Sequence, residues 1–183
     1  TGYLLRIGID HFKEINDNFG QEYGDFVLKK TAECISGCTS EGQKVYKLVA
    51  DEFLILDVAS DEAKDADKLY DKVREAIDRF IETNEFKVMY TVSGGIVPFA
   101  ALKGNQCSEA LKLTDFALNE AKKLGRNRCY IFNGETYRKF LRKREITQEL
   151  REAVINGFQG FTAFYQPVFA EDKKVPYGAE ALM

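Results

Sequence analysis

The sequence predicts an α/β fold in which a central sheet carries helices on its faces. Hydrophobic patterns follow the order strand, helix, helix, strand, strand, helix, strand, helix, strand along the chain. Two of the strands, 45–48 and 53–58, flank a four-residue turn and therefore form an antiparallel hairpin. The 183 residues are 45% hydrophobic and 30% charged, which is typical of a globular domain with a core of its own.

The first part of the sheet comes from residues 3–9, which are mostly apolar, as in a strand that is covered on both faces. A short helical stretch follows from Asp10. A longer helix is expected from about Tyr23 to Ser36, because its apolar residues recur with helical spacing. We expect Gly37 to end this helix.

The next elements are assigned in the same way. Residues 63–83 predict an amphipathic helix, and residues 88–98 a strand that contains two glycines. Another amphipathic helix is expected at 108–124, with Gly125 closing it, before a short last strand at 128–132.

The remainder of the chain has a different character. Residues 135–156 predict one long, charge-rich helix, and strand-like sequence returns at 161–168. The helix carries a basic cluster, for which we favour a solvated face over phosphate binding: Arg138, Lys139, Arg142, Lys143 and Arg144.

The charge of the chain argues against two classes of partner. The net charge is −3, so neither nucleic acid nor an anionic membrane is favoured. No apolar run approaches the ~20 residues that cross a bilayer. We expect no signal peptide, and the abrupt opening on a strand indicates a longer parent protein.

A known family is suggested by three segments in a fixed order. The run Tyr3-Leu4-Leu5-Arg6-Ile7-Gly8-Ile9-Asp10-His11-Phe12-Lys13-Glu14-Ile15-Asn16-Asp17 is followed by Gly24-Asp25 and by the signature Val49-Ala50-Asp51-Glu52-Phe53. This order resembles the GGDEF family, the diguanylate cyclases that join two GTP molecules into cyclic di-GMP. The resemblance implies a nucleotidyl cyclase-like fold with a mostly antiparallel five-stranded sheet. The signature is degenerate, because Val49 and Ala50 stand where the family has two glycines, and no residue is assigned as catalytic.

The resemblance also implies a weakened Mg²⁺ site. The family holds the ion with an aspartate at the end of the first strand and with the third residue of the signature. Asp51 and the backbone of Ile9 match that set, whereas Gly8 stands at the strand position and has no side chain. Asp10 and Glu52 are further candidate ligands.

The nucleotide contacts of the family have counterparts in this chain. Asn16 and Asp25 match the pair that recognises the guanine edge, since an amide and a carboxylate suit its donors and acceptors. Lys13, Lys122 and Arg126 match the residues that reach the phosphates. The family's Arg-x-x-Asp inhibition motif has no counterpart, because residues 40–43 are Ser-Glu-Gly-Gln.

The C-terminal residues resemble the opening of an EAL domain, the phosphodiesterase that linearises cyclic di-GMP. The resemblance is carried by Tyr165-Gln166-Pro167 and by Glu180-Ala181-Leu182, and it implies that Glu180 is a metal ligand of that domain. The expected organisation is a degenerate GGDEF domain at 1–134, a linker helix at 135–157 and an EAL fragment at 158–183.

Three functions remain open on this basis. The first is a regulatory module that binds GTP, or another guanine nucleotide, for an EAL phosphodiesterase in the same chain. The second is an active diguanylate cyclase with an altered metal set of Asp10, Asp51 and Glu52. The third is a purely structural dimerisation or relay module. The expected location is the cytoplasm, where the chain could also be the cytoplasmic part of a larger, membrane-anchored sensor. A homodimer is a further expected partner.

Overall fold

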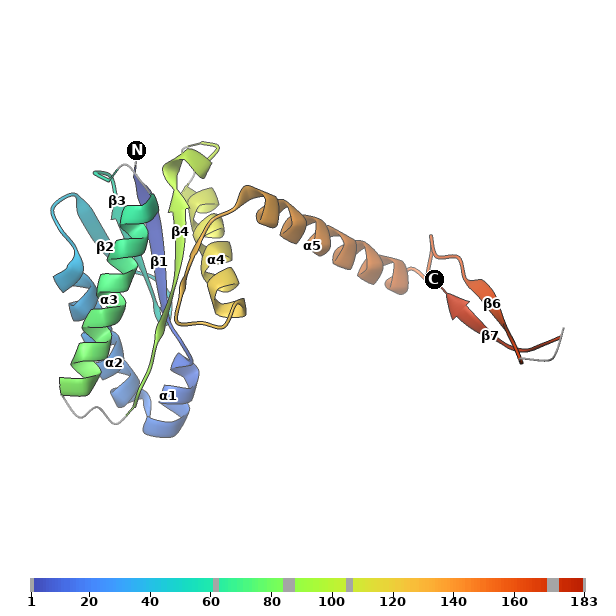
Figure 1. Cartoon of the computed structure of the whole chain (residues 1–183), viewed down its shortest axis with the longest axis horizontal. Coiled ribbons are helices and arrows are strands. Elements are labelled where there is room, and N and C mark those ends of the chain that lie inside the picture. The colour runs from blue at the N-terminus through green and yellow to red at the C-terminus, as the bar shows by residue number, and fades with distance from the viewer. Residues whose placement is uncertain (1, 61–62, 84–87, 105–106, 171–174, 183) are drawn as a thin grey trace. The chain divides into compact units, whose positions relative to one another are not determined.

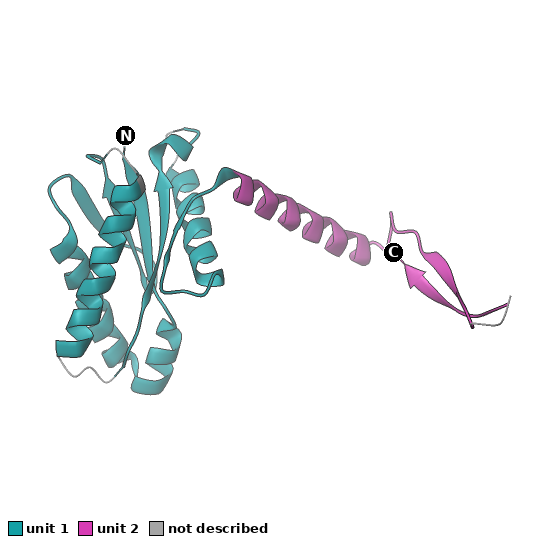
Figure 2. Ribbon diagram, viewed as in Figure 1, with its two compact units in different colours: residues 1–134 teal, residues 135–183 magenta. Residues whose placement is uncertain are grey.

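The structure is a computed structural model that describes residues 2–60, 63–83, 88–104, 107–170 and 175–182. Its internal contacts divide the chain into two compact units, Thr1–Gly134 and Glu135–Met183 (Figure 2).

The first unit is built on a five-stranded sheet, as the sequence predicts (Figure 1). Its order is β2-β3-β1-β4-β5, and every neighbouring pair is antiparallel except β4 and β5, which are parallel. The α/β fold with a mostly antiparallel sheet is therefore confirmed. The strands are β1 (Tyr3–Ile9), β2 (Gln43–Lys47), β3 (Glu52–Asp57), β4 (Val92–Pro98) and β5 (Cys129–Ile131).

The helices of this unit lie close to their expected positions. They are α1 (Phe12–Phe19), α2 (Gln21–Cys38), α3 (Ala63–Thr83) and α4 (Cys107–Lys123), with a short 3-10 helix, η1, at Phe99–Ala101. The prediction that Gly37 ends the second helix is wrong. Gly37 lies inside α2, which ends at Cys38, where Thr39 is extended and its Oγ1 donates to the carbonyl of Ser36 at 2.9 Å.

Two adjacent glycines of β4 show how the helices are divided between the faces of the sheet. A Cβ built on Gly94 would lie 2.8 Å from the ring of Tyr70, which belongs to α3. A Cβ on Gly95 would lie 2.3 Å from the backbone nitrogen of Leu118, in α4. Because successive residues of a strand point to opposite faces, α3 covers one face and α4 the other.

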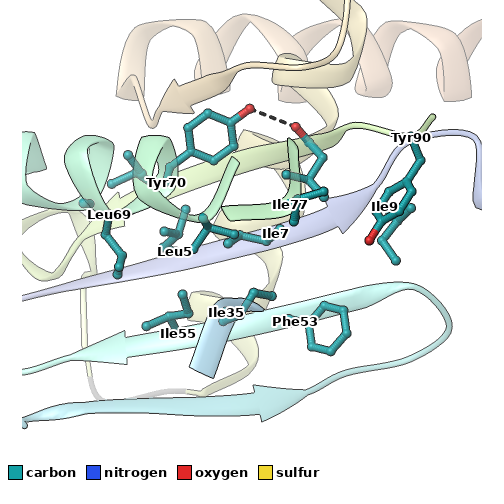
Figure 3. Close-up of a cluster of buried hydrophobic side chains, with 14 of the residues drawn as sticks. Leu5, Ile7, Ile9, Ile35, Phe53, Ile55, Leu69, Tyr70, Ile77 and Tyr90 are labelled. Atoms are coloured by element: carbon teal, nitrogen blue, oxygen red, sulfur yellow. Dashed lines mark hydrogen bonds between the residues drawn. The ribbon is translucent and has the colours of Figure 1, made fainter. Parts of the chain in front are cut away.

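The main core fills the space between the sheet and the α2–α3 side. β1 contributes Leu5, Ile7 and Ile9, which are at most 1% exposed. Figure 3 shows these side chains gathered with others from β3, α2 and α3, namely Phe53, Ile55, Ile35, Leu69, Tyr70 and Ile77. Burial of this apolar surface explains why the central strand reads as almost continuously hydrophobic.

The alternate residues of β1 face α4 and carry the candidate site. Gly8 pairs with Glu52 of β3 on one side and with Ser93 of β4 on the other. Since paired residues in a sheet point to the same face, Glu52, Gly8 and Ser93 form a row across the end of the sheet beneath α4.

The second unit consists of one helix and one hairpin. Helix α5 (Gly134–Ile155) contains no buried residue. Strands β6 (Phe164–Phe169) and β7 (Pro176–Leu182) are antiparallel, with Gln166 opposite Glu180. Among the described residues, none of the helices has the length and apolarity that spanning a membrane requires.

Candidate functional site

At Gly8, the strand position of the predicted metal site, the side chain of Lys122 fills the space next to the backbone. A Cβ built on Gly8 would lie 3.2 Å from the Nζ of Lys122 and 3.1 Å from Cδ2 of Leu118, both from α4. The ammonium group of Lys122 therefore occupies the space that a side chain at position 8 would enter.

Glu52 is held by two cationic side chains. Nε of Arg6 donates to Oε2 of Glu52 at 2.7 Å, and Nη2 of Arg6 donates to the same oxygen. Nζ of Lys122 lies 3.9 Å from the other carboxylate oxygen of Glu52. The side chains of Arg6 and Glu52 are only 14% and 18% exposed, so solvent screens this ion pair weakly.

Arg6 also connects this group to α4. Its Nη1 donates to the backbone carbonyl of Leu111 at 3.3 Å, and its Nη2 lies 3.3 Å from a carboxylate oxygen of Asp115. Four side chains therefore form one network, with two positive and two negative charges: Arg6, Lys122, Glu52 and Asp115. We call these residues the Arg6 network.

Asp10, a further candidate ligand, is buried and bonded to its neighbours. It is 3% exposed, and its carboxylate accepts hydrogen bonds from Thr91 and Ser93, each at 2.7 Å. The backbone N–H of Asn127 donates to it at 3.2 Å. Asp10 therefore joins the end of β1 to β4 and to the loop after α4.

The signature turn differs in backbone conformation at Val49 and Ala50, the two residues that replace the family glycines. Ala50 has φ 54, in the left-handed region, whereas Val49 has no positive φ and is 84% exposed. The β-branched residue therefore avoids the strained position, and the smaller residue adopts it.

A lysine further stabilises the turn from inside. Nζ of Lys47 donates to the backbone carbonyls of Leu48 at 3.1 Å, of Glu52 at 3.4 Å and of Ala50. Burial lowers the pKa of Lys47, although the negative charges of Asp51 and Glu52 oppose that shift.

Asp51 is the one predicted carboxylate ligand that remains uncommitted. The structure gives its side chain no hydrogen bond or ion pair within the described residues, and its backbone carbonyl accepts from the N–H of Ile9 at 3.2 Å. No cluster of three or more histidine, cysteine, aspartate or glutamate side chains suited to a metal is found in the described part of the chain. The residues described at this end of the sheet do not fit a Mg²⁺ ion as they stand, because Gly8 offers no side chain and Glu52 is bound by Arg6 and Lys122.

The two residues predicted to recognise guanine, Asn16 and Asp25, lie on α1 and α2. Oδ1 of Asn16 is buried and has no hydrogen-bond partner among the residues that the structure describes. A Cβ built on Gly24 would lie 1.8 Å from this oxygen, so Asn16 packs where only a glycine leaves room. Asp25, the next residue, is exposed, as is Lys13 on α1.

Sequence analysis places Gly24 in the family pattern but gives it no role. The signal that could have found it is the spacing of eight residues between Asn16 and Gly24, across a short break between two helices. In the structure the break is Gly20, with φ 84, and it brings the two helices together.

The two predicted phosphate residues near the end of α4 are separated by a turn. Lys122 belongs to the Arg6 network, whereas Arg126 is exposed, with φ 60. The N–H of Arg126 donates to the carbonyl of Ala121 at 3.2 Å, which fixes this loop against the helix end.

Residues 40–43, which stand in place of the inhibition motif, form hydrogen bonds that stabilise the fold. Nε2 of Gln43 donates to Asp57 at 2.7 Å, and Oε1 of Gln43 accepts from the N–H of Ser40 at 2.9 Å. Burial acts to raise the pKa of Asp57, but hydrogen bonds from Gln43, Ser60 and Ala59 outweigh it and lower that pKa to about 2.

A cavity of about 510 Å³ lies between α1, α3 and the start of β4. Its lining includes the carboxylates of Glu14, Asp78 and Glu82, which would repel a triphosphate. Asn16 and Asp25, the residues predicted to recognise guanine, are not among its lining residues.

The fold and this arrangement define a cyclase-like α/β domain, with the signature residues at the end of its sheet. The family model described as "Diguanylate cyclase, GGDEF domain" matches residues 1–128. The chain therefore belongs to the GGDEF family, the domain family of cyclic di-GMP signalling.

Relatives with different printed activities resemble the chain. The cyclic di-GMP phosphodiesterase NbdA of Pseudomonas aeruginosa is 29% identical over 181 residues, which are 98% of this chain and 22% of NbdA. The diguanylate cyclase DgcZ of Escherichia coli is 30% identical over 128 residues, 69% of this chain and 42% of DgcZ. The chain thus spans less than half of either relative.

A solved structure supports the fold assignment. The active GGEEF domain of a diguanylate cyclase from Vibrio cholerae superposes with a TM-score of 0.61 at 28% identity, covering 72% of this chain and 83% of that chain.

Proposed function

We propose that residues 1–134 form a degenerate GGDEF domain that binds a guanine nucleotide, does not condense it, and regulates an EAL phosphodiesterase in the same chain. The observation that carries this proposal is the state of Gly8 and Glu52. Gly8 offers no ligand, and Glu52 is bound by Arg6 and Lys122, while Asn16 and Asp25 remain available to a guanine edge.

Loss of the metal end bears on condensation more than on binding. Joining an α-phosphate to a 3′-hydroxyl needs divalent metal to neutralise phosphate charge and activate the attacking oxygen. Recognition of guanine depends instead on an amide and a carboxylate, and Asn16 and Asp25 supply both. A site that keeps the guanine contacts but lacks the metal ligands would still bind the nucleotide and would not condense it.

The regulated partner is proposed from the second unit. Helix α5 would serve as the linker over 135–157, and the β6–β7 hairpin as the beginning of the EAL domain at 158–183, with Glu180 as its metal ligand. The match to NbdA supports this organisation because it extends over 98% of the chain. We place the module in the cytoplasm, where GTP is available.

Titration calorimetry of the 183-residue chain with GTP tests the proposal, with ATP as the matched control. We expect saturable binding of GTP below millimolar concentration, weaker binding of ATP, and no cyclic di-GMP after incubation with Mg²⁺ or Mn²⁺. Absence of GTP binding at millimolar nucleotide would support the purely structural module instead. Formation of cyclic di-GMP would establish the active cyclase.

A regulatory role needs one further measurement in the parent protein. Phosphodiesterase activity should change when GTP is added, and Asn16→Ala together with Asp25→Ala should abolish that change. An unchanged response in the double variant would contradict the regulatory role of this pocket.

A further inference from the structure

The Arg6 network occupies the place where a divalent ion would be bound. Glu52 and Gly8 are direct partners across β3 and β1, and Nζ of Lys122 sits 3.2 Å from the Cβ position above Gly8. Arg6 lies two residues before Gly8 on the same face of β1, because side chains alternate along a strand.

The charges of the network balance without a metal. Two cations, Arg6 and Lys122, face two carboxylates, Glu52 and Asp115. The guanidinium of Arg6 donates to Glu52 through both Nε and Nη2. A divalent ion that approached Glu52 would have to displace a half-buried guanidinium and would be repelled by both cations.

We propose that Arg6 and Lys122 together act as a built-in substitute for the divalent ion, and that Arg6 is the residue that excludes it. Nucleotide binding by this domain is then independent of Mg²⁺, a consequence that rests on the proposed function. The exclusion itself does not depend on nucleotide.

The metal site is then lost through two positions, Gly8 and Arg6. Restoring a carboxylate at position 8 alone would give Lys122 a new partner and leave Glu52 bound to Arg6. Restoring it while removing Arg6 would release Glu52 and place three carboxylates, at positions 8, 51 and 52, at the end of the sheet.

Mn²⁺ binding, measured by the loss of the free-ion signal in electron paramagnetic resonance, tests the proposal without any nucleotide. The variants are Gly8→Asp, Arg6→Leu and the two combined, each compared with the wild type. We expect no binding below 1 mM in the wild type or in either single variant, and at least tenfold tighter binding in the double variant. Arg6→Gln combined with Gly8→Asp serves as a second double variant if leucine impairs folding, as judged by circular dichroism.

Three outcomes would overturn the proposal. They are Mn²⁺ binding by the wild type below 1 mM, equal binding by Gly8→Asp and the double variant, and a folded double variant that binds no better than either single one. In a parallel titration of the wild type, the GTP affinity should change less than twofold between excess Mg²⁺ and EDTA. A tenfold loss in EDTA would contradict metal independence, whereas absence of GTP binding would contradict only the proposed function.

Discussion

At the sheet end of the site, Arg6, Glu52 and Lys122 satisfy one another, whereas at the α1–α2 end Oδ1 of Asn16 is buried without a hydrogen-bond partner in the described residues. Buried polar groups are normally paired, because an unpaired one loses about 1–3 kcal/mol of solvation. The polar groups at the sheet end therefore have their partners within the protein, whereas Oδ1 of Asn16 at the helical end is left to accept a hydrogen bond from a ligand.

The largest effect is expected where α4 packs on the sheet. Gly95→Ala should destabilise the domain by about 3 kcal/mol, because the new Cβ would lie 2.3 Å from the backbone of Leu118. Gly8→Ala, one residue from the end of β1, meets only side-chain atoms at 3.1 Å or more and should cost less than about 0.5 kcal/mol. Urea unfolding of both variants measures the contrast. Equal costs would mean that Gly8 is retained for packing rather than marking a lost side chain.

The next effect concerns the self-satisfied charges. Glu52→Gln should lower the free energy of unfolding by about 2 kcal/mol, because it leaves the half-buried Arg6 short of its charged partner. Asp51→Asn, the adjacent residue, should change it by less than about 0.5 kcal/mol, since its side chain has no partner in the described structure. Denaturant curves at pH 7 decide this. A larger cost for Asp51→Asn would show that the sheet end is not organised around Glu52.

The helical end is tested through its own glycine. Gly24→Ala should weaken GTP binding about tenfold, or ~1.4 kcal/mol, because the methyl group displaces the side chain of Asn16. Gly37→Ala lies on the same helix with nothing within 4 Å and should leave affinity unchanged while raising stability by about 0.5 kcal/mol. Calorimetry with GTP gives both values. Unaltered affinity in Gly24→Ala would remove Asn16 from the nucleotide contacts.

The smallest effect is expected at the signature turn, which lies directly before Glu52. Ala50→Gly should raise the free energy of unfolding by about 0.5 kcal/mol, since it relieves a left-handed alanine at φ 54 while adding freedom to the unfolded chain. Val49→Gly, where φ is not positive, should have no such benefit. Thermal unfolding at one pH compares them, and a destabilised Ala50→Gly would contradict the assigned turn.

Sequence patterns predict most of the fold because hydrophobic periodicity is a local property. The expected helix at 63–83 has the same bounds as α3, and the order of all nine elements of the first unit is confirmed, apart from the short η1. Gly37 failed as a helix end because glycine permits a left-handed turn but does not require one.

The contacts of the site were much less predictable, because they join residues that are distant in sequence. Arg6 and Glu52 are 46 residues apart, and their pairing follows from the register of β1 on β3. Asp10 accepts hydrogen bonds from Thr91 and Ser93, which are more than 80 residues further on. A motif identifies which residues are present, but the cross-strand register decides which of them are already committed.

The second unit carries one feature with a wider consequence. Helix α5 has 22 residues, about 33 Å of helix, and none of them is buried. A helix with no fully buried residue depends largely on its backbone and on pairs such as Lys139 with Glu135, so little of its stability comes from a packed core. A surface that covers Leu150 and Val154, which are 45% and 52% exposed, would therefore stabilise the helical state of this segment.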